Sequence, residues 1–255
     1  MLQIKELELN QNDYSKKAMI YSDTECVPKA ALLYFHGGGL LYGDKADLPD
    51  YHITRMTQAG YAIISYDYPL SPAAKLPLIM EDICSSINHY VENCTKYTDL
   101  SLPYFLWGRS AGAYLCLIAA PVSASCLTAV PEELHTTGDL ETHYSVYVYA
   151  RQNGCWKDLI YEGREKFFLL DYSLRTCDKL PCPLFCAHSM GDTDVPYEEF
   201  LELCRKYNAK RYIASCNEHD FDRNTEIPAT RSLLDSSIVF LEQCTSNSIS
   251  HARES

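Results

Sequence analysis

Long apolar runs are missing from this sequence. None of its 255 residues lies in an uninterrupted apolar stretch of the roughly 18 residues that a membrane-spanning helix needs. The first residues, MLQIKELELNQND, are polar and charged and contain no apolar block of the kind found in secretory signals. We therefore expect no membrane partner and a cytoplasmic location, unless a leader has been removed.

Basic side chains are also scarce. The chain has 22 Lys and Arg against 34 Asp and Glu, a formal net charge of −12. Nucleic acids and anionic lipid surfaces are bound mainly through Lys and Arg, so we predict neither as a partner. Apolar residues make up 47% of the chain, which excludes an intrinsically disordered protein.

Metal and disulfide patterns are absent. The sequence contains no C-x-x-C and no H-E-x-x-H motif, and its twelve cysteines are dispersed from Cys26 to Cys244. Several of them, such as Cys84 and Cys116, occupy apolar positions of predicted helices, where a free thiol behaves as a small hydrophobic group. We therefore expect reduced cysteines and no metal or other cofactor.

Predicted strands and helices alternate along most of the chain. The predicted strands are short segments at 4–9 and 19–22, then 30–35, 61–66, the apolar run before Gly108, 145–150, 183–189 and 211–215. The predicted helices are 49–59, 78–96, 111–120, 196–207 and 229–244. This alternation predicts an α/β fold with a mostly parallel sheet and helices on both faces. We expect a single domain over 1–244 and a disordered tail over 245–255.

One region does not follow the alternation. Residues 121–143 are polar and irregular, and 151–179 is rich in aromatics, including Trp156 and Tyr161. A plain connection between two strands is shorter than this. We predict a small lid within 121–179, and a crossover helix alone is the alternative.

Glycines are few, and two of the eleven flank a serine in Gly108-Arg109-Ser110-Ala111-Gly112. The pentapeptide fits G-x-S-x-G and lies between a predicted strand and a predicted helix, the setting of a nucleophile elbow. A serine in such a strained turn needs neighbours without a Cβ atom. Ser110 is therefore the candidate nucleophile, and an ordinary glycine turn is the alternative.

An acid and a histidine follow two later strands. Asp192 and Asp194 come after the strand at 183–189, and His219 comes after the strand at 211–215. Serine, acid and then histidine is the order in which an elbow enzyme carries its triad. We favour Asp192 over Asp194 as the acid, because Asp194 lies closer to the N-cap of the helix predicted from Pro196. His188 is excluded as the base because it precedes the acid.

Three successive glycines end the strand at 30–35, in His36-Gly37-Gly38-Gly39. A tetrahedral intermediate carries a developing negative oxygen, which preorganised N–H groups stabilise. We predict an oxyanion hole made by the amides of Gly38, Gly39 and Ala111, with His36 bracing the loop. A flexible strand-to-helix loop is the alternative.

These motifs together resemble a known family. HGGGLLYGD, SYDYPLSP, GRSAGAY, GDTDVPY and EHDFD are similar, in this order, to motifs of the α/β-hydrolases of the hormone-sensitive-lipase-like group, the serine esterases with an HGGG motif. The resemblance extends from about residue 30 to 244 and implies the α/β-hydrolase fold. In this family the first residue of D-x-x-V-P often carries the triad acid, which matches Asp192. The second and third glycines of HGGG bind the oxyanion, which matches Gly38 and Gly39.

The chain departs from the family pattern beside the serine. The usual GDSAGG is GRSAGA, so Arg109 replaces an acid and Ala113 replaces a glycine. The usual D-Y-R-L-x-P lacks its arginine, since Pro69 stands in that place. The region before HGGG is short for the cap that many relatives carry there, so we expect any lid to come mainly from 121–179.

The sequence thus predicts a carboxylesterase-type serine hydrolase that cleaves esters of small to medium acyl groups through an acyl-enzyme intermediate. The alternatives are a peptidase or amidase of the prolyl-oligopeptidase-like type and a non-catalytic ligand-binding protein on the same fold. An interfacial lipase would need a large apolar lid, which 121–179 does not suggest. The acyl and alcohol groups, the ester or amide preference and the oligomeric state stay open.

Overall fold

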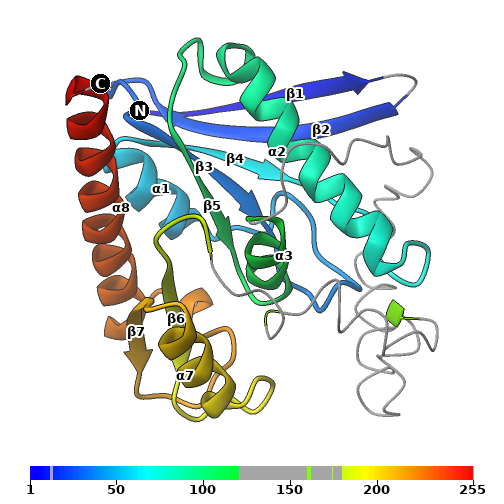
Figure 1. Cartoon of the computed structure of the whole chain (residues 1–255), viewed down its shortest axis with the longest axis vertical. Coiled ribbons are helices and arrows are strands. Elements are labelled where there is room, and N and C mark those ends of the chain that lie inside the picture. The colour runs from blue at the N-terminus through cyan, green and yellow to red at the C-terminus, as the bar shows by residue number, and fades with distance from the viewer. Residues whose placement is uncertain (12–13, 121–159, 162–173, 175–179, 255) are drawn as a thin grey trace.

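The computed structural model describes residues 1–11, 14–120, 160–161, 174 and 180–254. Its main sheet has five strands in the order β1-β2-β4-β3-β5 (Figure 1). These strands are β1 (Leu2–Gln11), β2 (Tyr14–Asp23), β3 (Ala30–Phe35), β4 (Tyr61–Tyr66) and β5 (Tyr104–Gly108). β3 runs parallel to β4 and β5, whereas β1 and β2 form an antiparallel hairpin that pairs antiparallel with β4.

Helices cover both faces of this sheet, because the central strands are apolar on both faces. Ala31, Leu33 and Phe35 of β3 share a core with α2 (Leu76–Thr98) and α3 (Ala111–Ala119). Their alternate neighbours in β3 belong to a second core that includes side chains of α1 (Asp50–Gln58) and α8 (Pro228–Glu254). Every residue of β3 and β4 is buried, as a strand between two helical layers must be.

The second part of the fold contains a smaller sheet, which is a parallel pair of strands. It consists of β6 (Phe185–Ser189) and β7 (Lys210–Ala214), with α7 (Tyr197–Lys206) between them in the chain. Within the described residues this pair has no strand pairing with the main sheet. α8 runs along both parts (Figure 1), and Phe240 of α8 packs its ring 5.5 Å from that of Phe185.

Most predicted elements occur close to their expected positions, and the strands at 30–35 and 61–66 match to the residue. The hairpin strands are longer than predicted. The tail prediction differs from the structure, since α8 continues past Cys244 to Glu254. No glycine or proline follows residue 244 to end the helix, and the hydroxyls of Thr245 and Ser246 bond to carbonyls four residues earlier.

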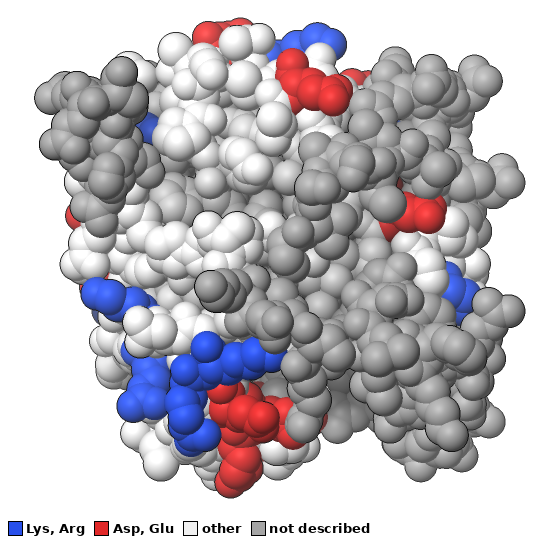
Figure 2. Space-filling view, viewed as in Figure 1, with Lys and Arg blue, Asp and Glu red and all other residues white. Residues whose placement is uncertain are grey.

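The predicted strand at 145–150 and nearly all of the predicted lid within 121–179 lie outside the described residues. Among the described helices, none combines the length and hydropathy needed to cross a membrane. On the face shown in Figure 2, acidic and basic side chains lie together over α7. This helix has Glu198 and Glu199 in its first turn and Arg205 and Lys206 in its last, an arrangement that complements the helix dipole.

Candidate active site

The turn between β5 and α3 carries Ser110. Its φ of 49° and ψ of −117° lie outside the regions that a non-glycine residue ordinarily occupies, and its side chain is exposed. Close backbone packing holds this turn. A Cβ atom on Gly108 would lie 2.3 Å from the carbonyl carbon of Gly112, and one on Gly112 would lie 2.0 Å from the carbonyl oxygen of Phe35. The two glycines of G-x-S-x-G are therefore required by contact between segments.

Ser110, His219 and Asp192 are brought together from three chain segments. The Ser110 hydroxyl is 2.7 Å from Nε2 of His219, and Nδ1 of His219 is 2.7 Å from Oδ2 of Asp192. Because a carboxylate only accepts hydrogen bonds, Nδ1 carries the proton and Nε2 is left free to accept from the serine. This is the geometry in which a histidine can act as a general base.

Asp192 is the acid that contacts the histidine. Its side chain is 3% exposed, and its Oδ1 accepts bonds from the amides of Asp194 and Val195 at 2.7 and 3.0 Å. Burial opposes the charge, but the bonds from His219, Val195 and Asp194 outweigh it and hold the pKa of Asp192 below its ordinary value. The structure places the N-cap of α7 at Pro196, which makes no side-chain capping bond.

His188 also faces Asp192. Its Nε2 is 3.7 Å from Oδ2 of Asp192, which is farther than the 2.7 Å between Nδ1 of His219 and the same oxygen. Its Nδ1 is 2.7 Å from the carbonyl of Ser189, and its ring packs on Phe200 of α7. His188 therefore lies behind the acid, whereas His219 lies between the acid and the serine.

The glycine loop passes beside the nucleophile. A Cβ atom on Gly37 would lie 3.3 Å from Cβ of Ser110, so the backbone there comes as close to the serine as a side chain allows. Gly38 and Gly39 have φ values of 100° and 61°. A side chain on Gly38 would also meet the carbonyl of Tyr42 at 2.0 Å, so this turn requires glycine.

His36 braces this loop from beneath. It is buried and its ring stacks on Tyr68 with centroids 4.1 Å apart, while the Tyr68 hydroxyl donates to the carbonyls of His36 and Gly37 at 2.8 and 3.2 Å. Burial lowers the pKa of His36, which keeps its ring neutral. A side chain on Gly43 would meet Nδ1 of His36 at 2.4 Å, so the loop is closely packed around the ring.

Ala111 is the first residue of α3, directly after the serine. The amides of Gly112, Ala113 and Tyr114 bond to the carbonyls of Arg109 and Ser110, and among the described residues the Ala111 amide has no acceptor. An amide at this position points out of the helix start, where the helix dipole favours negative charge.

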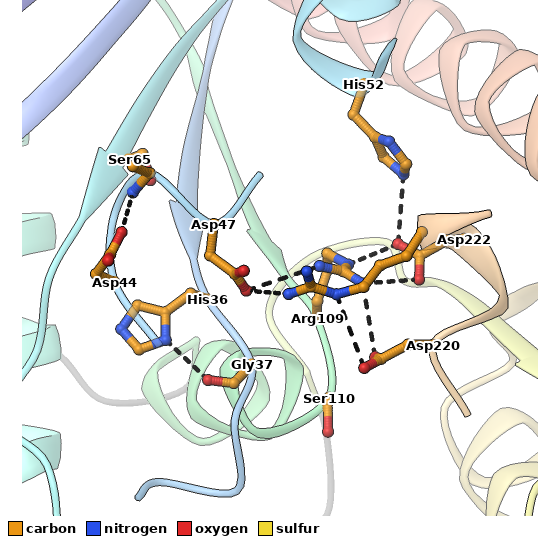
Figure 3. A network of polar contacts seen from close by, with 12 residues as sticks. His36, Gly37, Asp44, Asp47, His52, Ser65, Arg109, Ser110, Asp220 and Asp222 are labelled. Carbon is orange, nitrogen blue, oxygen red and sulfur yellow. Dashed lines mark hydrogen bonds and ion pairs between the residues drawn. The ribbon is translucent and has the colours of Figure 1, made fainter. Parts of the chain in front are cut away.

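An ion network beside the serine was not predicted from the sequence (Figure 3). Arg109 is 7% exposed, and its Nε and Nη2 donate to the two carboxylate oxygens of Asp222 at 2.6 and 3.0 Å. The only signals for this network in the sequence are the positive charge of Arg109 in the elbow motif and the two acids, Asp220 and Asp222, that follow His219. Nothing in their spacing indicates that they meet.

A cavity borders Ser110, His219 and Asp192 and continues between β5 and β6. Ala113 and Tyr114 of α3 line it beside the serine, and Phe221 lines it beside the histidine. The surface around the nucleophile is thus concave and largely apolar, as a small-molecule site requires. Among the described residues, no three His, Cys, Asp or Glu side chains come together as metal ligands would.

Sequence comparison identifies the family. The BD-FAE family model matches residues 20–149, about half of the chain. The chain belongs to the BD-FAE family. The matched range contains both the glycine loop and the elbow of this BD-FAE protein, whereas Asp192 and His219 lie beyond it.

Curated relatives of this BD-FAE protein include lipases and esterases. It is 29% identical over 105 residues to lipase 2 of Moraxella sp. strain TA144 and 28% identical over 104 residues to human hormone-sensitive lipase, 41% of the chain in each case. It is 33% identical over 94 residues, 36% of the chain, to an acetyl esterase of Salmonella paratyphi B. The alignments span 24%, 10% and 28% of those relatives' lengths.

Solved structures agree on the fold. The chain is similar to a Staphylococcus aureus protein of unknown function with a TM-score of 0.76 and 24% identity, covering 94% of this chain and 99% of that one. An α/β-hydrolase superfamily protein from Enterococcus faecalis gives 0.70 and 23%, covering 93% and 99%. The predictions of an α/β-hydrolase fold and of a hormone-sensitive-lipase-like relationship are confirmed.

Proposed function

We propose that this protein is a carboxylesterase-type serine hydrolase that cleaves esters of small to medium acyl groups. The observation that carries the proposal is the unbroken hydrogen-bond chain from Ser110 through His219 to Asp192, with 2.7 Å at each step. Its members are 109 and 27 residues apart in sequence, so only the fold brings them into line.

In the proposed reaction the Ser110 hydroxyl attacks the ester carbonyl while Nε2 of His219 takes its proton. The imidazolium formed in this step is stabilised by the carboxylate of Asp192, whose lowered pKa keeps it ionised at neutral pH. His219 then returns the proton to the leaving alcohol, and an acyl-Ser110 ester remains. A water molecule activated by His219 releases the acid and restores the serine.

The developing oxyanion is assigned to the amides of Gly38, Gly39 and Ala111. The proximity of the glycine loop to Ser110 and the position of Ala111 at the start of α3 support this assignment. Loss of one such donor typically removes about 3 kcal/mol of transition-state stabilisation.

The names of the relatives support ester hydrolysis and the proposed length of the acyl group. Two of the curated relatives are named lipases and a third an acetyl esterase, whose name indicates a short acyl group. No residue of the proposed mechanism requires a metal or another cofactor. An ester of small to medium acyl length is therefore the substrate class to test.

The test is a series of p-nitrophenyl esters from acetate to decanoate, together with aminoacyl p-nitroanilides, on wild type, Ser110→Ala and the control Ser101→Ala. Ser101 is an exposed serine before β5. We expect ester turnover that declines beyond medium chains and that only Ser110→Ala abolishes. Faster anilide than ester cleavage would identify an amidase instead. Absence of turnover together with no labelling of wild type by a fluorophosphonate would favour a ligand-binding protein.

A further inference from the structure

The side chains of Ser110 and its neighbour Arg109 leave the elbow in different directions. Ser110 is exposed to the cavity, whereas Arg109 is buried between β5 and the segment that follows His219. Figure 3 shows the guanidinium lying between Asp47 on one side and Asp220 and Asp222 on the other. A single residue of the elbow thus contacts the segments that flank the serine.

The contacts with the histidine segment are the strongest. Asp222 is bound by two charge-assisted bonds in the fork geometry that only a guanidinium provides, and Oδ1 of Asp220 is 3.5 Å from Nη2 of Arg109. Between these two acids, Phe221 is 4% exposed and anchors the segment in an apolar cluster. Since Asp220 directly follows His219, Arg109 holds the backbone one residue from the proposed base.

The network continues to the glycine-loop segment. Nη1 of Arg109 is 4.0 Å from Oδ2 of Asp47, and Arg223 donates to the same carboxylate. Asp47 stands at the end of the loop that begins at His36. The three segments that carry the proposed nucleophile, base and oxyanion donors therefore meet in one ion cluster.

Burial makes these contacts strongly coupled. The side chains of Arg109 and Asp222 are 6% and 15% exposed, and His52 places Nε2 at 3.3 Å from the same carboxylate. Burial alone would raise the pKa of Asp222, but the close contact with His52 and the charge and hydrogen bonds of Arg109 hold it well below its usual range. Removing one partner would leave an uncompensated buried charge.

We propose that Arg109 is a positioning residue that sets His219 against Ser110 by holding Asp220 and Asp222. The inference rests on the proposed function and extends it to a residue that acts through the placement of His219. A displacement of about 1 Å at a reacting group can cost about 100-fold in rate, so a loop-borne histidine needs an anchor of this kind. Arg109 brings a positive charge into the elbow, and Asp222 supplies the matching opposite charge.

The test compares Arg109→Gln and Arg109→Lys with Asp82→Asn. Asp82 pairs with Lys16 at 2.5 Å in a buried ion pair that joins β2 to α2, so its variant reports the effect of losing a buried charge pair outside the site. Two quantities are measured at a temperature where circular dichroism shows each variant to be folded. They are kcat and KM for the best p-nitrophenyl ester, and the low-field proton resonance of the His219 Nδ1–H bonded to Asp192.

We expect Arg109→Gln to lower kcat about 100-fold with KM nearly unchanged, and to shift or remove the low-field resonance. Arg109→Lys keeps the charge without the fork and should fall between wild type and Arg109→Gln. Asp82→Asn should lower the melting temperature and leave both site readouts as in wild type. If Arg109→Gln does not fold, Arg109→Lys and Asp220→Asn carry the same comparison.

The proposal is overturned if folded Arg109 variants keep the wild-type kcat and resonance. It is equally overturned if Asp82→Asn reduces kcat as much as Arg109→Gln, because the effect would then be general destabilisation. The resonance is recorded without substrate, so it tests the placement of His219 even if no ester is hydrolysed. Failure of the proposed function, seen as absent turnover in wild type, is therefore distinguishable from failure of this inference.

Discussion

Ser110 and His219 stand on parts of the molecule that are held in different ways. The serine follows β5, whose neighbour β3 is fully buried between two helical layers, and close backbone contacts at Gly108 and Gly112 hold its turn. The histidine follows β7, where Lys210 and Arg211 are exposed. Apolar packing and steric contact thus hold the first part, whereas the ion cluster around Arg109 joins the second part to it. The two parts should therefore respond differently to substitution, pH and salt.

The largest effect is expected for a substitution in the proposed triad itself, which belongs neither to the packing of the elbow nor to the ion cluster around Arg109. Asp192→Asn should reduce kcat by about 10,000-fold, because the amide no longer holds His219 in the tautomer that accepts from Ser110. Steady-state hydrolysis of the best p-nitrophenyl ester measures the effect. Asp194→Asn is the matched control two residues away and should remain within a few-fold of wild type. Equal losses in the two variants would contradict the assignment of the acid.

Substitution in the elbow should act through sterics. Gly112→Ala places a Cβ atom 2.0 Å from the carbonyl oxygen of Phe35, and we expect it to lower the free energy of unfolding by about 3 kcal/mol or more at any pH at which the protein folds. Urea denaturation followed by circular dichroism measures this loss. Ala113→Gly, one residue later in α3, adds no side-chain atoms and should cost only about 1 kcal/mol. A smaller loss for Gly112→Ala than for Ala113→Gly would show that the elbow relaxes easily.

Substitution in the ion cluster should depend on pH. The folded-state pKa of Asp222 lies below the ordinary value of about 3.9, so its contribution to stability is complete above that value and is lost as pH falls through the folded-state pKa. Asp222→Asn should therefore destabilise the protein by about 2 kcal/mol at pH 7 and by progressively less below about pH 4. Denaturation midpoints of wild type and variant from pH 3 to 7 measure this. A difference that stays constant over the range would mean that Asp222 acts by packing rather than charge.

The exposed ion pairs along α8 should matter least. Arg55 of α1 pairs with Asp235 of α8 on the surface, where both side chains are more than a third exposed. Arg55→Gln should change the free energy of unfolding by less than about 1 kcal/mol, and salt at 0.5 M should remove even this difference. Thermal melts of wild type and variant at low and high salt provide the measurement. A larger loss would show that surface pairs, and not only the buried cluster, join the two parts.

Local sequence patterns predicted the core of the fold. The apolar runs at 30–35 and 61–66 and the amphipathic pattern in 78–96 indicated buried strands and a covering helix because burial imposes its periodicity on nearby residues. The end of α8 was missed because a polar segment without glycine or proline has no stop signal, and local helix bonding extends it to Glu254. The lid prediction within 121–179 stays a prediction, since nearly all of that segment lies outside the described residues.

Features of the candidate site also divide into those that local sequence indicates and those that only the tertiary structure shows. The sequence by itself determined the residue types and the order of the predicted serine, acid and histidine, because strand ends of an α/β sheet share one edge and each motif is local. The contact between His219 and Asp192, the second histidine behind that acid and the joining of Arg109 to Asp222 are seen only in the tertiary structure. Arg109 and Asp222 are 113 residues apart, and no local pattern specifies a contact over that separation. Only the tertiary structure, in which α8 packs against both the main sheet and β7, brings the two charges together in a buried place.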